Sequence, residues 1–289
     1  MTPAEILKLL IVASVVGSVF SLALRSQPQD ILYLFCRPAL ALRAFVAMFL
    51  IVPLATLGLV LVLSPGPVVA IALLVLSLSP VPPLLPKKQA KAGAEGSYDT
   101  GLLVAAAIAS LFVMPIGLDL FSYFFQRATA PVPLSGMGIT LAITIAAPLA
   151  AGLAAQAVIK DRERRTRLAD TIGKGSGIVL IVCALALVAF LFPSLGKVVG
   201  GGALVAIVAM ILVGLAAGWA LGGPPSADKP ALALAAASRH PGIAIGVITA
   251  SFPEEGDAVL AVVVFLLTNT IVTALFTRKL ASRSPEAAT

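Results

Sequence analysis

The sequence predicts an all-α polytopic membrane protein with nine transmembrane helices, and three observations support this fold class. Of the 289 residues, 60% are hydrophobic and 11% are charged, whereas a soluble domain has about 25% charged residues. The mean hydropathy is +1.08. Most apolar runs approach the roughly 20 residues that a helix needs to cross a bilayer, and they lack the alternation of a membrane β-barrel. We therefore expect residues 1–289 to form one integral membrane domain.

The nine expected spans are joined by short polar segments. The first is interpreted as a span and not as a cleaved signal, because Glu5 precedes it and neither a basic leader nor an Ala-x-Ala site is present. The third and eighth spans are interrupted by helix-breaking residues. The expected spans are approximately 5–24, 41–63, 67–92, 101–123, 134–158, 175–193, 198–222, 229–252 and 256–277.

The basic residues predict the orientation. Most of the 20 Lys and Arg residues fall in segments on one side of these spans. The positive-inside rule places that side in the cytoplasm, with the N-terminus outside the plasma (inner) membrane and the C-terminus inside. The main cluster, Lys160–Lys174, is expected to be a cytoplasmic loop that contacts anionic lipid. The net charge of +7 is thus explained by topology and does not indicate a nucleic-acid partner.

The composition argues against an enzyme and against a metal cofactor. Cys36 and Cys183 have no metal-ligand spacing and suit apolar packing, and the chain has one histidine. An enzyme acting on a lipid anion would need an acid–base pair within the membrane. Asp99 and Asp119 are expected at the membrane interface, so they do not supply that pair.

The two interrupted segments are Ser77–Lys88 and Ala235–Gly242. Their prolines remove backbone donors and free carbonyls, which hydrocarbon tolerates only where protein or a water-filled cavity shields them. Two such interruptions in the two halves of a chain are typical of the central site of a secondary transporter. They lie five spans apart, so the two segments cross in opposite directions, as in an inverted-topology repeat.

The chemistry of these segments predicts an anion site. New helix N-termini are expected near Pro83–Lys88 and near Pro241–Gly242, and such ends bind carboxylate, phosphate or sulfate groups. Lysine and arginine side chains add full positive charges there. The residues expected to contact a small organic anion are Pro83, Leu84, Leu85, Pro86, Lys87, Lys88, Arg239, His240, Pro241, Gly242 and Asn269.

Each polar residue of this set has an alternative interpretation. Lys87 and Lys88 could extend to the cytoplasmic surface and act only on topology. Arg239 could cap the freed carbonyls of the other interrupted helix instead of binding substrate. His240 could satisfy backbone groups at the interruption, or carry a proton. Asn269 could pack between helices.

A series of short motifs resembles a known family. In order they are Pro28-Gln-Asp30, Arg37-Pro38, Val52-Pro53, Pro65-Gly-Pro67 and Ser238-Arg-His-Pro-Gly-Ile-Ala244. Their order and the two interruptions resemble the bile acid:sodium symporter family, within the superfamily that includes auxin efflux carriers. The resemblance implies a ten-helix plan without its first helix. It also implies a panel domain (5–63 in part, and 134–193) and a core domain with two crossing helices (67–92 and 229–252).

The family's substrates are organic anions, usually coupled to sodium, but the expected sodium ligands are missing here. By position they correspond to Met48, Pro86, Ala235 and Arg239. Sodium prefers oxygen ligands, and a guanidinium would repel it. The favoured function is therefore alternating-access transport of a small organic anion without the usual sodium sites. The alternatives are a sodium-coupled symporter of bile-acid-like anions, and an anion channel or non-transporting receptor. Oligomeric state and substrate identity stay open.

Overall fold

A computed structural model shows a helical protein, without β-strands in the residues that it describes. Eight helical segments are long and apolar enough to cross a membrane. They are Ile6–Arg25, Pro38–Leu63, Tyr98–Phe121, Ile139–Val158, Arg162–Ala186, Ala203–Leu221, Asp228–Ser251 and Asp257–Leu280. The described residues are 3–82, 85, 89, 96–124, 139–190, 196, 198, 200, 202–223, 228–252 and 257–282.

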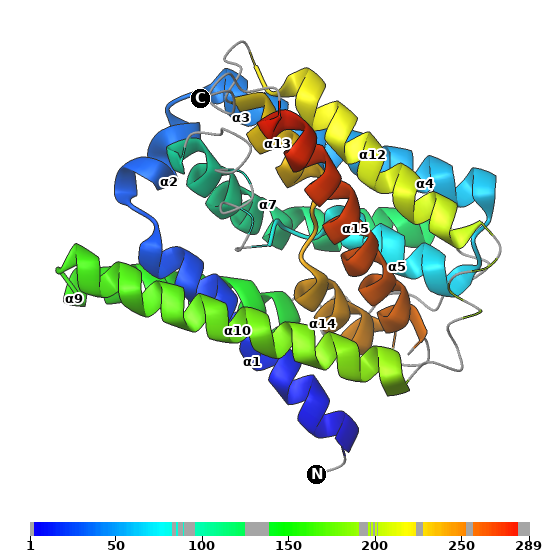
Figure 1. Cartoon of the computed structure of the whole chain (residues 1–289), viewed down its shortest axis with the longest axis horizontal. Helices are drawn as coiled ribbons and strands as arrows, with labels where there is room; N and C mark the ends of the chain where they lie inside the picture. The colour runs from blue at the N-terminus through cyan, green and yellow to red at the C-terminus, as the bar shows by residue number, and fades with distance from the viewer. Residues whose placement is uncertain are drawn as a thin grey trace.

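Three of these segments contain an irregular turn, and Figure 1 shows the arrangement of the helices. Two of the turns are π-helical and the third is the gap between α13 and α14. The elements are α1 (Pro3–Arg25), α2 (Pro28–Phe35), α3 (Pro38–Phe45), η1 (Val46–Ile51), α4 (Val52–Leu63), α5 (Pro67–Leu78), α7 (Gly96–Phe124), η2 (Ala142–Ala146), α9 (Ala147–Val158), α10 (Arg162–Phe190), α12 (Ala203–Leu221), α13 (Asp228–Ala237), α14 (Pro241–Ser251) and α15 (Asp257–Ala281).

The expected third span, 67–92, differs from the others. The first part of this span is the helix α5. Its 12 residues cover about 18 Å, which is less than the hydrocarbon thickness. Gly66 with φ +89° and Pro67 at the first helical position begin this helix. It ends at Leu78, and residues 79–82 are not helical. α5 therefore ends where an interruption was predicted, and most of the remainder of this expected span lies outside the described residues.

The helices pack in two groups, as Figure 1 shows. α1 lies along both α9 and α10. α12 packs against α13 and α4, and α5 packs against α15 and α4. α14 contacts α1, α5 and α15 and so connects the two groups. As a result, the gap between α13 and α14 lies in the interior, where residues 228–248 are almost all buried.

A repeated glycine motif brings α12 and α13 together. Gly214 and Gly218 of α12 and its C-cap residue Gly222 recur every four residues on the side that faces α13. A Cβ atom added at Gly214 would lie 2.6 Å from the Ala237 Cα atom, and one at Gly222 would lie 2.5 Å from the Lys229 Cα atom. The two backbones thus touch at the glycines, as in close-packed membrane helix pairs.

One expected loop is a helix instead. α10 begins at Arg162 and runs without a break through the basic cluster. The Asp161 carboxylate accepts hydrogen bonds from the backbone N–H groups of Glu163 (2.9 Å) and Arg164 (3.3 Å), which makes it the N-cap. Glu163 also pairs with Arg167 one turn later. These local interactions extend the helix beyond the apolar region, so the prediction of a loop over Lys160–Lys174 was wrong.

Candidate functional site

The two predicted interruptions contact each other. α13 ends at Ala237, α14 begins at Pro241, and the residues between them are not helical. The backbone N–H of His240 donates a hydrogen bond of 2.8 Å to the carbonyl of Pro80, which follows α5. Segments that are 160 residues apart in the chain are therefore joined at their irregular turns.

Arg239 lies at this junction and is buried, with 1% of its side chain exposed. Its Nη1 donates to the Ser79 carbonyl (3.1 Å) and its Nη2 donates to the Met48 carbonyl (2.6 Å). The guanidinium carbon also lies 5.8 Å from the centre of the Phe49 ring. Its Nε has no hydrogen-bond partner. The capping alternative for Arg239 is thus seen directly, and one donor is still free.

Prolines explain why these two carbonyls are available. In η1 the Val52 N–H bonds to the Ala47 carbonyl, one residue further back than in an α-helix. The next residue, Pro53, has no N–H, so the backbone offers no such donor to the Met48 carbonyl. The Ser79 carbonyl faces the same loss, because residues 82 and 83 are prolines. A buried carbonyl needs a donor, and Arg239 supplies one to each.

His240 caps α14. Its Nδ1 accepts a hydrogen bond of 3.3 Å from the Ile243 N–H, and Pro241 takes the first helical position. Gly242 lies so close to Val15 of α1 that an added Cβ atom would collide with the Val15 side chain. His240 thus satisfies a backbone group at the interruption, while its buried Nε2 has no partner.

This capping role leads to a prediction for His240. The variant His240→Asn should keep the cap, because asparagine is among the best N-cap residues, whereas His240→Ala should lose about 0.5–2 kcal/mol of stability. Thermal unfolding of the two purified variants measures this difference. If His240 acts as a cap and not as a proton carrier, His240→Asn should also leave the pH dependence of liposome uptake unchanged. Loss of that dependence in the asparagine variant would instead assign the proton to His240.

The other predicted residues fall into three groups. Asn269 of α15 is buried and donates from Nδ2 to the Ser238 Oγ at 3.4 Å, and its Oδ1 has no partner. Leu85 and Ala235 are buried in the hydrophobic core. Residues outside the described part of the chain are Pro83, Leu84, Pro86, Lys87 and Lys88. Arg239, His240 and Asn269 are therefore the polar side chains that the structure brings to the junction.

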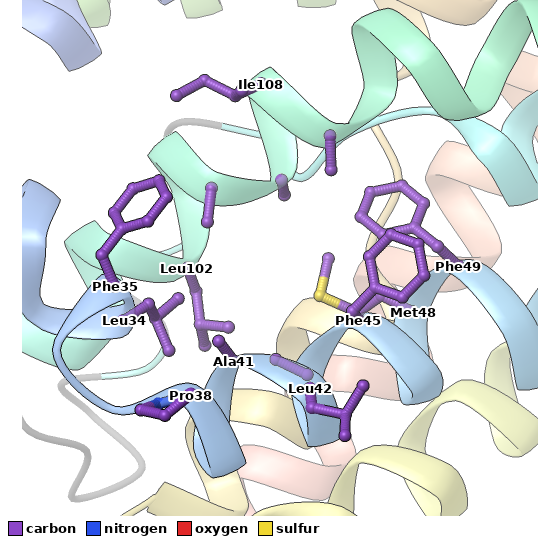
Figure 2. A pocket seen from close by; sticks show the side chains of 14 residues that line it. Leu34, Phe35, Pro38, Ala41, Leu42, Phe45, Met48, Phe49, Leu102 and Ile108 are labelled. Carbon is purple, nitrogen blue, oxygen red and sulfur yellow. The ribbon is translucent and has the colours of Figure 1, made fainter.

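A nearby apolar pocket was not predicted from the sequence. Its volume is about 480 Å³, and its walls come from α2, α3 and η1 on one side and from α7 on the other. Figure 2 shows Phe45, Met48 and Phe49 at one end of the pocket. Met48 and Phe49 also contact Arg239, so the pocket adjoins the junction. The available signal was the run of small residues Ala105–Ala109, which faces these larger side chains.

A second polar region is buried at the start of α7. Asp119 is exposed near the end of α7, but Asp99 at the start of the same helix is 1% exposed. Both residues were expected at the membrane interface, and burial does not test that depth, because protein can cover a residue there. Tyr98, Gln89 and Asp228 are buried as well. Tertiary packing buries Asp99, and its position near the end of an apolar run could not reveal that packing.

The packed apolar helices identify a multi-pass helical membrane protein, whose non-helical segments after α5 and between α13 and α14 contact each other. A family model described as the Sodium Bile acid symporter family matches residues 13–198, more than half of the chain. The protein belongs to this family, which confirms the resemblance seen in the sequence. Members of the family are membrane transporters and not enzymes, and they carry small organic anions such as bile acids. No curated protein matches the chain.

Proposed function

We propose that this protein is a secondary transporter of a small organic anion, which binds where the two interrupted helices meet. The buried guanidinium of Arg239 is the observation that carries the proposal. Arg239 forms no ion pair with a described carboxylate. A buried charge without a counter-ion is costly, and two carbonyl dipoles offset only part of that cost. A substrate carboxylate or sulfate would supply the missing charge.

Two neighbouring features support an anion with an apolar body. The N-terminal end of α14 directs a positive partial charge at the same junction. The 480 Å³ pocket beside Met48 and Phe49 has an almost entirely apolar lining and a volume that suits a small ligand. An amphipathic anion would place its charged group near Arg239 and its apolar part in this pocket.

Alternating access follows from an inverted repeat. Counting nine spans and a missing first one, the repeat pairs α1 with α10, α4 with α12, and α5 with the helices around the second interruption. These three pairs are in contact, which supports the assignment, whereas the fourth pair of the repeat, α7 with α15, is not among the closely packed pairs. We propose that the group of α1, α9 and α10 is the panel and that the core containing the interruptions moves against it.

We propose that this protein lacks the usual sodium sites of the family. Met48 offers its carbonyl to Arg239, Ala235 has no oxygen in its side chain, and the guanidinium of Arg239 stands where a neutral ligand is expected. A fixed cation then takes the place of a bound one. Family membership favours the alternative function, which is that of a sodium-coupled symporter.

The two functions differ in their response to sodium. We expect small organic anions to raise the thermal midpoint of the detergent-purified protein equally in sodium and in potassium buffer. A ligand at 100 times its dissociation constant stabilises by about 2.7 kcal/mol, which a melting curve detects. A shift that requires sodium would overturn the sodium-free site and support the symporter. Anion currents through liposomes that exceed the turnover of an alternating-access cycle would instead indicate a channel.

A further inference from the structure

A second buried polar cluster lies where α7 and α13 begin, and its Gln89 directly follows the first interrupted segment, Ser77–Lys88. It consists of Gln89, Tyr98, Asp99 and Asp228, each at most 5% exposed. Gln89 is fixed to α13 by a hydrogen bond of 2.8 Å from its Nε2 to the Ala231 carbonyl, one helical turn after Asp228. The Asp228 carboxylate acts electrostatically on both the Tyr98 hydroxyl and the Asp99 carboxylate. The four side chains therefore form one group.

The oxygen atoms of this group are unsatisfied. The Gln89 Oε1, the Tyr98 hydroxyl and both carboxylate oxygens of Asp99 have no hydrogen-bond partner. Buried polar groups are almost always paired, and an unpaired carboxylate is the most costly to bury. A second carboxylate in the same group raises that cost further. Four unpaired oxygens from three residues could together coordinate a positively charged ligand.

The described protein does not provide that charge. Asp99 takes part in neither of the ion pairs of the described residues. Arg37 stacks on the Tyr33 ring at 3.8 Å, and Tyr33 in turn contacts the Tyr98 ring at 6.0 Å, so this exposed cation is separated from Asp99 by aromatic rings. Among the described residues, no cation is therefore paired with the Asp99 carboxylate.

The donor set indicates which cation fits. Carboxylate, amide and hydroxyl oxygens are hard ligands, which suit alkali and alkaline-earth ions. Within the described residues, no three His, Cys, Asp or Glu side chains gather, which argues against a transition metal. Within this cluster, Asp99 has a carboxylate with both oxygens unpaired, and a single positive charge balances that carboxylate. We propose that Gln89, Tyr98 and Asp99 bind a monovalent cation of sodium size beside Asp228, between α7 and α13.

The cluster borders the apolar pocket along α7. Leu102 follows Tyr98 by one turn of α7 and lines the apolar pocket. The proposed ligands do not include Arg239 or the positions where the family resemblance places sodium, so the proposal does not rest on the anion site.

Equilibrium binding of radioactive sodium to the purified, detergent-solubilised protein tests the proposal without any organic anion. We expect saturable binding that lithium competes for better than choline does. Asp99→Asn, which preserves shape, should weaken the affinity by roughly tenfold or more, about 1.4 kcal/mol. Tyr98→Phe, which removes only the hydroxyl, should weaken it less. Asp119→Asn is the matched control, because it makes the same change at an exposed position of the same helix.

Three results would overturn the cation site. The first is an absence of saturable sodium binding to the folded wild-type protein. The second is an unchanged affinity in both Asp99→Asn and Tyr98→Phe. The third is displacement of sodium by micromolar calcium or magnesium, which would assign the cluster to a divalent ion. Should Asp99→Asn fail to elute as a single species in size-exclusion chromatography, Tyr98→Phe decides the outcome.

Discussion

Replacing Arg239 with alanine is expected to abolish anion binding and to destabilise the protein. The variant removes the buried positive charge, and it leaves the carbonyls of Ser79 and Met48 without their donor. Each unsatisfied buried carbonyl costs about 1–3 kcal/mol. The thermal midpoint of the purified variant measures the loss of stability, and the shift of that midpoint with organic anions measures binding.

Two controls separate the charge from the capping role. Arg239→Lys keeps a positive charge but cannot present a planar fork to two carbonyls, so it should retain some anion response at a lower thermal midpoint. Arg164→Ala makes the same change as Arg239→Ala on an exposed turn of α10 and should alter neither measurement. A folded Arg239→Ala protein with undiminished anion affinity would contradict the proposed site.

The role of Arg239 shows how far the sequence could predict this site. Its depth in the span and Pro241 two residues later were sufficient to predict an interruption there, and the structure has a non-helical gap between α13 and α14. Its carbonyl partner in η1 is 191 residues away in the chain. The π-helical turn before Pro53 frees that carbonyl, but sequence alone does not tell which distant donor will satisfy it. A helix breaker therefore predicts a free backbone group and leaves its partner undetermined.

Burial was harder to predict than helix position. Asp99 and Lys160–Lys174 both lie at the ends of apolar runs, and both were assigned to the membrane surface on that ground. The first is buried, because α7 begins against α2 and α13. The second is an exposed helix, because Asp161 caps it. Hydropathy measures transfer into lipid, so it does not distinguish a surface residue from one covered by a neighbouring helix. The Asp161 cap was readable from the sequence, whereas the burial of Asp99 depends on tertiary contacts.

The glycine motif of α12 gives the second large expected effect. Gly218→Ala should lower the thermal midpoint and the yield of folded protein. The added Cβ atom would lie 2.5 Å from the Ala233 Cα atom of α13, and still closer to the Leu232 carbonyl, where backbone and not a flexible side chain blocks it. Overpacking of this kind costs about 1–3 kcal/mol. The strain also reaches the site, because α13 leads directly into Arg239.

Gly58→Ala is the matched control for this prediction. Gly58 lies inside α4, and a Cβ atom added there would meet nothing within 4 Å. Alanine is the better helix former by about 0.8–1.0 kcal/mol, so this variant should be as stable as the wild type or more stable. Opposite changes at Gly58 and Gly218 would show that contact between α12 and α13, and not helix propensity, sets the stability of this pair. If Gly218→Ala were equally well tolerated, the two helices would have to separate at little cost. The wall that holds Arg239 against η1 would then be too loose to keep its charge buried.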